Sequence, residues 1–536
     1  MGDDVDFAER LLERSKIAWE KKTQFDNLYR DAYKYGMPQR NGYDEPTPGS
    51  PRMDEVFDST AITATTAFAT RLQTEFTPMF QRFASFEAGP LVPKRERTKL
   101  NKILGSVSER AFAILDISNF HSAVGEFYLD LAAGTGVMFV EETKGKQHAS
   151  PVRFTTVPAY QVAIEEGPDG AAEGVFYKWK LPLRNVKRTW PDARPSTDLA
   201  DRIKDKPDAE ETFLCATVFD EDKGVFLYDV IDEKAKESIL RRPRRYMENP
   251  WIVCRWMKAA NEVNGRGPLV QALPDIRTLN KLIELILKNA SLSVSGVYTA
   301  TDDGILNPGV VRIVPGAVIP VMRNPGHPSG ASLVPLPRAA DFNVASLERD
   351  DLRAQIKRTL FDVGLPPDTG PVRSPTEIVA RMKDLASNIG GAFGRLMSEF
   401  IQPLFRRLLG IMQRSGLLND VGAVKLTGYL VQIKVTSPLA RLQNASDIEA
   451  VLNWLQALAV LGPELVAISA KVEDIGEWLG TKFGAPAELI RDPEERKAHM
   501  AETQRMNAEA QAAAQVKMDV ATGTGGVTQA PEAQVA

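Results

Sequence analysis

The chain has 536 residues, of which 43% are hydrophobic and 25% are charged, so it can bury a large core divided among several substructures. Its 70 acidic side chains outnumber its 66 basic ones, which gives a formal net charge of −4. A protein that grips nucleic acid by neutralising phosphates normally carries a basic excess. The charge therefore disfavours a tight DNA-binding protein, although a local basic patch or a passage for DNA stays compatible with it.

Neither the cysteines nor the apolar segments indicate a metal, disulfide or membrane protein. Cys215 and Cys254 lack CxxC spacing and are expected to be buried free thiols in a reducing compartment. The start of the chain is acidic and lacks the basic region of a signal peptide. The most apolar window, 455–470, contains Pro463 and Glu464 and is too short to cross a bilayer. We expect a soluble, cytosolic chain without direct membrane contact.

The N-terminal quarter is predicted to be mainly helical. Apolar residues at steps of three, four and seven predict a helix over residues 6–35, followed by a loop rich in glycine and proline. Three further helices are expected over 59–77, 93–119 and 121–133. An antiparallel β region follows, because short β-branched and aromatic runs alternate with turn residues. The expected strands are 137–140, 152–157, 174–179, 213–219, 225–231 and 251–256.

Two helices that flank a small insert come next. An apolar stripe predicts a helix over 269–289 and a second over 344–361, and the segment 294–342 between them is β-like and punctuated by proline and glycine. The segment 364–373 is too rich in proline to be helical. These elements predict an out-and-back excursion of the chain.

A long helix is predicted directly after the proline-rich segment. Ser374-Pro375-Thr376-Glu377 forms a strong helix start, and the apolar stripe continues to residue 414. A helix over 375–414 would be about 60 Å long, with bends expected at Gly390-Gly391 and at Pro403. Residues 440–500 are again helical in pattern. The end of the chain, 507–536, has almost no large apolar residues and is expected to be disordered or only transiently helical.

No motif for catalysis, metal binding or cofactor binding is present in the sequence. The four histidines are scattered, and no phosphate-binding loop or nucleophile elbow occurs. Gly134-Thr-Gly136 precedes a predicted strand, which is the wrong order for dinucleotide binding. Gly265-Arg-Gly-Pro268 is best explained as a turn and a helix start. We therefore expect no enzyme, no cofactor, and no catalytic or metal residues.

One basic run stands out as a candidate contact for nucleic acid or a packaging partner. It consists of Arg241, Arg242, Arg244 and Arg245. The alternative is a strand end that is solvated or makes salt bridges between subunits.

A Tyr33…Pro38 segment is followed by the run from Phe57-Asp58-Ser59-Thr60-Ala61 to Thr77-Pro78. This pattern resembles the head-to-tail connector family of podophage portal proteins. It continues in the family's order through Gly125-Glu126, Gly134-Thr-Gly136, Gly265 to Pro268, Leu273 to Ile276, Leu279-Asn280, Thr376 to Ile378 with Arg381, Glu399 with Pro403, and Ser437 to Ala440 with Gln443. No single motif is specific, but the ordered set covers nearly the whole chain. Ser374-Pro375-Thr376-Glu377 departs from the family's usual Thr-Ala-Thr-Glu type of helix start.

The resemblance implies an α+β class: an elongated portal fold with a helical stem, a small β-rich clip, a mixed α/β wing and a helical crown, assembling as a ring. The implied segments are 1–265 (wing, with N-terminal helices and the antiparallel β region), 266–293 (stem helix 1), 294–343 (clip), 344–363 (stem helix 2), 364–374 (tunnel loop), 375–438 (long wing helix and following strand), 439–506 (crown) and 507–536 (disordered tail).

The resemblance also implies a function. Such proteins form a dodecameric ring at one capsid vertex, through which double-stranded DNA is packaged and ejected. The implied partners are the terminase large subunit, docking transiently, then head-to-tail adaptor and tail proteins, and the major capsid and scaffolding proteins. Assembly would occur in the host cytoplasm, and the final location would be the portal vertex of the virion. The alternatives are another phage structural protein, such as a minor capsid or tail-tube component, and a packaging enzyme.

Candidate channel residues follow from the resemblance and from local charge. The implied tunnel loop includes Gly364, Pro366, Pro367, Asp368, Gly370 and Pro371. Arg373 is its only cation, and Arg353 and Lys357 on the preceding helix are further candidate phosphate contacts. The alternative is that these cations pair with Asp350, Asp351 or Asp362.

Overall fold

A computed structural model describes most of the chain and divides it into two compact units. The described residues are 2–44, 49–50, 52–143, 150–295, 298–301, 318–321, 333–335, 342–362, 391–419, 431–436, 438–462, 469–483, 491 and 493–521. The first unit comprises 1–85, 108–424 and 433–443, and the second comprises 86–107, 425–432 and 444–536. The division falls within helix α3 (Lys94–Ile117) and within the short strands β1 (Ala84–Ala88) and β14 (Val431–Val435).

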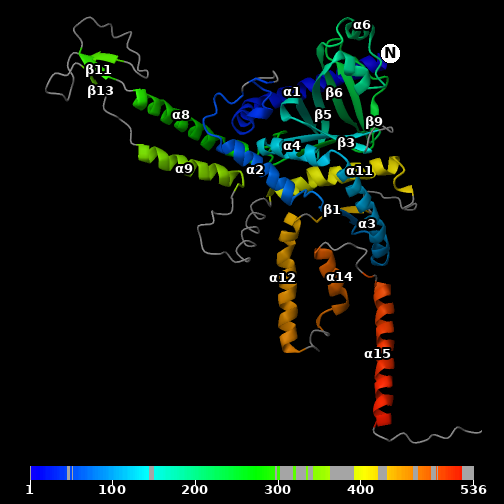
Figure 1. Ribbon diagram of the computed structural model, residues 1–536. Coiled ribbons are helices and arrows are strands. Elements are labelled where there is room, and N and C mark those ends of the chain that lie inside the picture. Colours follow the sequence, from blue (N-terminus) through cyan, green and yellow to red (C-terminus); the bar gives the residue numbers. More distant parts are fainter. Residues whose placement is uncertain are drawn as a thin grey trace, which may run out of the picture. The chain divides into compact units, whose positions relative to one another are not determined.

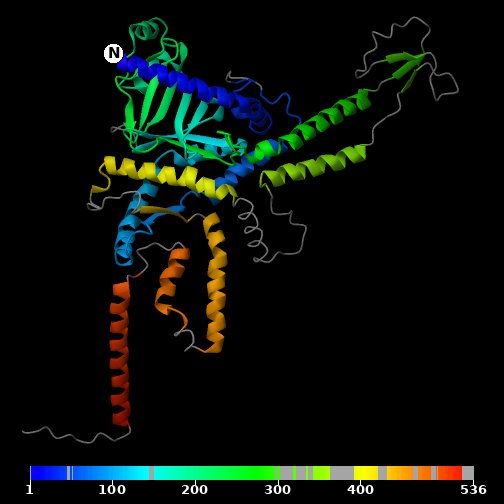
Figure 2. The same cartoon turned by 180° about the vertical axis from the view of Figure 1, so that it is seen from behind.

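A six-stranded antiparallel sheet forms the largest β element of the first unit. Its strand order is β4-β5-β6-β7-β8, and β9 also pairs with β7. The strands are β4 (Val162–Glu166), β5 (Ala172–Pro182), β6 (Glu210–Asp220), β7 (Val225–Asp232), β8 (Glu237–Ser238) and β9 (Arg244–Tyr246). The long first helix, α1 (Gly2–Gly36), lies across one face of this sheet (Figures 1 and 2).

Both faces of the six-stranded sheet are covered, which explains the almost continuous apolar run in β6. Successive side chains of a strand point to opposite faces. Leu214 and Ala216 pack with Ala8 and Leu11 of α1 on one side. Phe213 and Cys215, which alternate with them along β6, pack on the other side, in a cluster with the residues Leu183, Val186, Trp190, Leu199, Tyr228 and Val230. Helices α5 (Val186–Thr189) and α6 (Thr197–Asp205) contribute to that second cluster.

A second antiparallel sheet, with strand order β10-β2-β3, packs against helices. It is formed by β2 (Thr135–Glu142), β3 (Val152–Val157) and β10 (Trp251–Arg255). Helix α4 (Phe120–Ala133) contacts both β2 and β3 and also packs on α2 (Thr60–Glu75). Phe127 of α4 stacks on Phe400 with ring centroids 4.8 Å apart, which ties α4 to the helix that follows residue 391.

Two helices that pack against each other flank a small sheet in the sequence. They are α8 (Leu273–Ser295), preceded by the short α7 (Pro268–Gln271), and α9 (Phe342–Thr359). Between them the chain forms a three-stranded sheet of order β12-β11-β13, from β11 (Tyr298–Thr301), β12 (Val318–Val321) and β13 (Leu333–Pro335) (Figure 1). The expected excursion of two helices around a β-like insert is confirmed in these described parts.

The described part of the expected 375–414 helix contains a π-helical segment. Residues 396–401 form the π-helix, and α11 (Gln402–Arg414) continues directly from it. Pro403 lies at the start of α11, where its missing N–H and bulky ring require an adjustment of the preceding turn. The proposed helix start at Ser374 and the first bend at Gly390 lie outside the described residues.

Three helices belong to the second unit in addition to the first part of α3. They are α12 (Pro438–Leu461), which begins in the first unit, α14 (Val472–Phe483) and α15 (Pro493–Ala521). Lys102 of α3 forms an ion pair with Glu495 of α15 at 3.0 Å. Residues 507–521, for which disorder or only a transient helix was expected, are helical in α15. This segment is rich in alanine, with six Ala and two Gln among its fifteen residues, and both residue types have a high intrinsic helix propensity even without a packed core.

Other expected elements agree with the structure to within a few residues, and several short ones were missed. The structure adds α6 and the strands β1, β4, β8, β9 and β14. Cys215 and Cys254 are buried and free, as expected, and burial raises the pKa of the Cys215 thiol to about 12. Within the described ranges, no helix has both the length and the apolar character needed to cross a membrane.

Deleting residues 516–536 is expected to leave the assembly state and solubility of the chain unchanged. The side chains of 501–511 are already exposed, and the segment beyond them has too few large apolar residues to form a core. Mass photometry of the truncated and full-length chains, at equal concentration and salt, checks this. A smaller assembly for the truncated chain would show that the tail is an ordered part of an interface.

Candidate nucleic-acid interface

The two glycine motifs singled out in the sequence pack against each other. Gly134 ends α4 with φ 148°, and a Cβ added there would overlap the backbone carbonyl of Gly265. A Cβ on Gly267 would overlap the carbonyl of Ala132. Backbone hydrogen bonds close the joint, from Gly267 N to Ala133 O at 3.0 Å and from Trp256 N to Gly134 O at 2.9 Å.

This glycine joint therefore serves close packing of backbones and is not an anion-binding loop. Tyr29 of α1 donates a hydrogen bond to Gly265 O at 2.5 Å, and Thr135 accepts one from Gly265 N at 2.9 Å. Gly267 is the residue before α7, and Pro268 occupies its first turn, as the expected turn and helix start required. The joint thus fixes the start of α7 against α1, α4 and β2.

A buried charge network surrounds Arg255 at the end of β10. The Arg255 side chain is 2% exposed. Its Nη2 donates to Glu399 Oε1 at 2.9 Å and its Nε to Glu399 Oε2 at 3.2 Å. Its Nη1 pairs with Glu166, which Lys258 also contacts at 2.6 Å. Burial opposes the charge of Arg255, but the two carboxylates outweigh that cost and hold its pKa above the ordinary value.

Glu399 lies in the π-helical segment, so this network joins β10 to the helix that follows residue 391. The backbone N–H of Arg255 also donates to Glu399, at 2.9 Å, and Arg395 pairs with the same carboxylate at 3.1 Å. The sequence signal for this buried charge is a single Arg directly after the apolar run Trp251-Ile-Val-Cys254, and the sequence reasoning missed it.

The carboxylate of Asp130 in α4 is buried, and both of its oxygens accept hydrogen bonds. Tyr33 donates to Oδ1 at 2.7 Å and Arg40 donates to Oδ2 at 2.8 Å. Burial raises the pKa of Asp130, while Arg40 and Tyr33 act in the opposite direction. The arrangement orients α1 and α4, and it leaves no oxygen of this carboxylate without a donor.

The candidate channel residue Arg353 of α9 is paired within the chain. Its Nη2 lies 2.5 Å and its Nε 3.0 Å from Asp58 Oδ2, and Asp350 is 3.8 Å away. The Asp58 side chain is 5% exposed. Although burial works against its charge, hydrogen bonds from Thr60 and Arg353 hold the pKa of Asp58 below its usual range. The pairing alternative is confirmed for Arg353 with Asp350, but the main partner is Asp58, 295 residues away in the sequence.

The second candidate on α9, Lys357, is exposed and has no ion-pair partner among the residues that the structure describes. Asp351 instead accepts a hydrogen bond from Gln355 at 3.0 Å. Arg373 and the whole candidate loop lie outside the described residues. That loop comprises Gly364, Pro366, Pro367, Asp368, Gly370 and Pro371.

The basic run is split by the alternation of strand β9. Arg244 points to one face of the sheet, where its Nε donates to Asp192 at 3.0 Å and its guanidinium lies 5.8 Å from the Tyr228 ring. Arg245 points to the other face, opposite Leu227 in the register. Arg241, Arg242 and Arg245 are exposed. Arg244 is thus paired within its own chain, while salt bridges between subunits stay a prediction.

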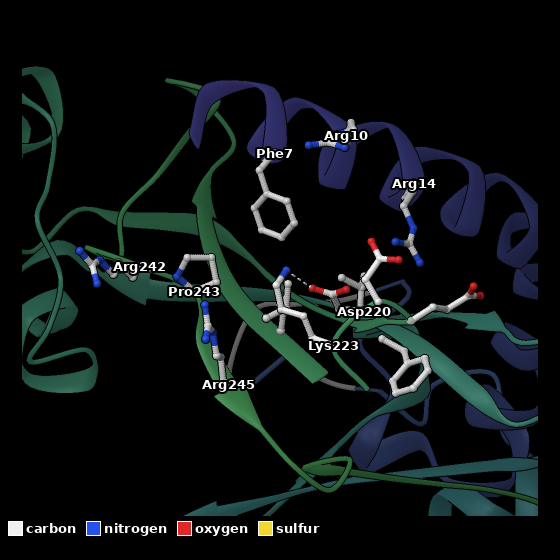
Figure 3. Close-up of a pocket in the computed structure, with 13 residues that line it drawn as sticks. Phe7, Arg10, Arg14, Asp220, Lys223, Arg242, Pro243 and Arg245 are labelled. Carbon is white, nitrogen blue, oxygen red and sulfur yellow. Dashed lines mark hydrogen bonds and ion pairs between the residues drawn. The ribbon is translucent and has the colours of Figure 1, made fainter. Parts of the chain in front are cut away.

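Arg242 and Arg245 line a cleft of about 870 Å³ (Figure 3). The cleft lies between α1, the turn that joins β6 to β7, and the segment leading into β9. The sequence reasoning missed its other walls, which are Phe7, Arg10 and Arg14 of α1 and the turn Asp220-Glu-Asp-Lys223. No local pattern could have joined these segments, because more than 200 residues separate Arg14 from the turn.

The described residues hold no cluster of three or more His, Cys, Asp or Glu side chains arranged to bind a metal ion. The buried carboxylates discussed above are occupied by arginines, lysine or tyrosine.

Comparison with known proteins gives a match along most of the chain. The family model described as "Bacteriophage head to tail connecting protein" matches residues 8–490. The chain is 24% identical over 336 residues to the portal protein of Enterobacteria phage T3, covering 62% of this chain and 59% of the relative. It is 25% identical over 260 residues to the portal protein of Escherichia phage T7, covering 48% and 46%. The aligned part thus spans about half the length of these curated relatives.

Among solved structures, a chain in the virion of a native gene transfer agent particle aligns at 11% identity with a TM-score of 0.30, over 86% of this chain and 96% of that one. A chain in the neck of an empty gene transfer agent particle aligns at 11% identity with a TM-score of 0.31, over 73% and 88%.

Proposed function

Because the chain belongs to the family of bacteriophage head to tail connecting proteins, we propose that it is the subunit of a portal ring at one vertex of a phage capsid. The observation that carries the proposal is the extent of the family match, which covers residues 8–490 and therefore the whole order of elements rather than one motif. The ring, on this proposal, is a dodecamer, and double-stranded DNA is packaged and later ejected through its centre.

The proposal assigns a role to each segment. Residues 1–265 form the wing, 266–293 and 344–363 the stem, 294–343 the clip, 364–374 the tunnel loop, 375–438 the long wing helix and following strand, and 439–506 the crown. The pairing of α8 with α9 and the small sheet between them support the stem and the clip. A closed ring needs a head-to-tail interface repeated around an axis, which a subunit of several extended elements can supply.

The net charge supports passage of DNA without tight binding. Twelve copies at −4 sum to about −48, which repels phosphate on average and leaves attraction to a few local cations. Arg353 is paired to Asp58, whereas Lys357 is exposed. Of the two candidates on α9, Lys357 is therefore the better one for a transient phosphate contact. Arg373 and the tunnel loop keep their proposed place at the narrowest part of the channel.

The proposed partners are the terminase large subunit during packaging, then adaptor and tail proteins, with the major capsid and scaffolding proteins around the ring. The protein assembles in the host cytoplasm and ends in the virion. We propose no enzymatic role. ATPase and nuclease assays with magnesium are expected to detect no activity, and an activity abolished by a single carboxylate substitution would contradict this.

Purified protein is expected to form rings with a central hole. Negative-stain electron microscopy and mass photometry at micromolar concentration, over a range of salt, measure this directly. Rings of twelve support the proposal, and a population of monomers and dimers under all conditions contradicts it.

Replacing Lys357 by glutamate is expected to leave rings intact and to lower the packaged DNA length or its retention by about twofold or more, because each subunit exchanges an attractive charge for a repulsive one. Packaged DNA is measured in particles, and ring formation is measured separately. Lys187→Glu, which changes an exposed lysine of the proposed wing, is the matched control.

If the Lys357→Glu and Lys187→Glu variants package DNA equally well, Lys357 does not contact DNA in the channel. Deletion of 364–374 tests the loop in the same assay. Normal rings with reduced packaging or retention support the loop's role, and unchanged packaging makes it a passive connector.

A further inference from the structure

The cleft between α1 and the six-stranded sheet has no part in the proposed channel, yet it has the features of a binding site. Its volume of about 870 Å³ can hold a segment of several residues. Figure 3 shows Arg10 and Arg14 entering from α1 and Arg242 and Arg245 lying on the opposite side, beside Pro243. The Lys223–Asp220 pair lies between the two sides.

The charges of the cleft fall into two groups. Arg14 is paired with Glu165 at 3.1 Å, and Lys223 is paired with Asp220 at 2.7 Å. The side chains of Arg242 and Arg245 are exposed and have no hydrogen-bonded or ionic partner in the part of the chain that the structure describes. The adjacent Arg244 differs from them, because its guanidinium donates a hydrogen bond to Asp192 of the same chain. Two guanidinium groups, each with five donors in a fixed fork, are thus left for an outside acceptor.

The cleft also presents apolar surface next to these arginines. Phe7 of α1 lines it, together with Leu227 and Pro243 of the sheet side, and Phe7 and Leu227 are only partly buried. A ligand that places an apolar side chain here would bury this surface while its acidic groups reach the arginines.

The same cleft is poorly suited to nucleic acid. Three consecutive carboxylates, Asp220, Glu221 and Asp222, line it, and Glu221 and Asp222 are exposed. A phosphodiester chain carries a charge on every nucleotide and would be repelled along this wall. A polypeptide can instead place its carboxylates at one end of the cleft and uncharged groups at the other.

We propose that this cleft binds a short acidic segment of another polypeptide, with carboxylates on Arg242 and Arg245 and an apolar side chain against Phe7 and Leu227. The inference is independent of the portal assignment, because it uses only residues of one subunit. It would stand even for a chain that failed to form rings.

A fluorescent peptide of about twelve residues in which Glu and Leu alternate is the probe, and fluorescence anisotropy with the full-length chain is the measurement. The same peptide with Gln in place of Glu is the ligand control. The double variant Arg242→Glu with Arg245→Glu removes the proposed contacts. Arg188→Glu, an exposed arginine of α5 outside the cleft, carries the same kind of charge change as a protein control.

The wild-type chain and Arg188→Glu are expected to bind the Glu peptide with similar, salt-dependent affinity and to bind the Gln peptide weakly. The double variant is expected to lose about tenfold in affinity. Asp222→Lys is expected to change the affinity in the opposite direction, because it removes a repulsive carboxylate. Circular dichroism confirms that each variant is folded.

Three outcomes would overturn the proposal. The first is the absence of peptide binding by the wild-type chain, and the second is equal binding by the double variant. The third is displacement of the peptide by a DNA duplex of about 20 base pairs, with DNA binding that depends on the same arginines. That result would make the cleft a nucleic-acid site. Ring formation is recorded in parallel, so that a failed portal assignment is distinguished from a failed cleft.

Discussion

Replacing Gly134 by alanine is expected to destabilise the chain by more than about 4 kcal/mol and to reduce the yield of soluble protein sharply. Two costs add at this position. The backbone has φ 148°, which side chains rarely adopt, and the new Cβ would overlap the backbone carbonyl of Gly265. A backbone carbonyl cannot turn aside as a flexible side chain can, so α4 or the loop before α7 must shift. Urea unfolding followed by circular dichroism measures the loss.

Gly224→Ala separates these two costs. Gly224 also has a positive φ, 62°, but a Cβ there meets nothing within 4 Å. Its substitution is expected to cost about 1–2 kcal/mol, the cost of the left-handed backbone alone. If the Gly134 and Gly224 variants lose the same stability, the close approach of the two glycine motifs contributes nothing, and our account of the joint is wrong.

Arg255→Met is expected to cost about 3–5 kcal/mol, because it removes a buried guanidinium and leaves the partly buried carboxylate of Glu399 without its main cation. Arg395 and the backbone N–H of Arg255 still contact Glu399, so the loss is expected to stay within this range. The melting temperature and the urea midpoint measure the effect. Arg184→Met is the matched control, because Arg184 pairs with Asp208 at 2.5 Å on the surface, where such pairs contribute about 0–1 kcal/mol.

The double variant Arg255→Met with Glu399→Leu gives a further check. It removes both members of the Arg255–Glu399 ion pair, while Glu166 keeps its ion pair with Lys258. Part of the lost stability is expected to return, since apolar pairs often replace buried ion pairs at little cost. A double variant that is less stable than Arg255→Met alone would show that Glu399 has a role other than balancing Arg255.

The glycine joint and the Arg255 network hold neighbouring parts of the first unit. The joint fixes α7, which leads directly into α8, against α1 and α4. The network fixes the helix after residue 391 against β10. In the proposed ring, α8 belongs to the stem, and these two sites would keep the start of the stem in a fixed orientation relative to the wing.

Much of the secondary structure followed from local sequence patterns. The helical stripes located α1, α4, α8 and α9, and the turn residues separated β5, β6 and β7, because these patterns depend on residues a few positions apart. The short strands β8 and β9 were missed, since strands of two or three residues carry no period to detect. The family resemblance, which rested on the order of weak motifs, is confirmed by the match over 8–490.

The sequence by itself determined the α+β content, the two helices around a β insert and the family. The tertiary structure alone decided what the charged residues do. Arg244 and Arg245 are neighbours of the same type, but Asp192 lies 52 positions from Arg244 and reaches only one face of β9. From the sequence, Arg353 and Lys357 were equally good candidates for a channel contact. In the folded chain, Asp58 of the segment before α2 pairs with Arg353. A charge is free or paired according to contacts between distant segments, and the local periodicity that specifies a helix or a strand carries no information about them.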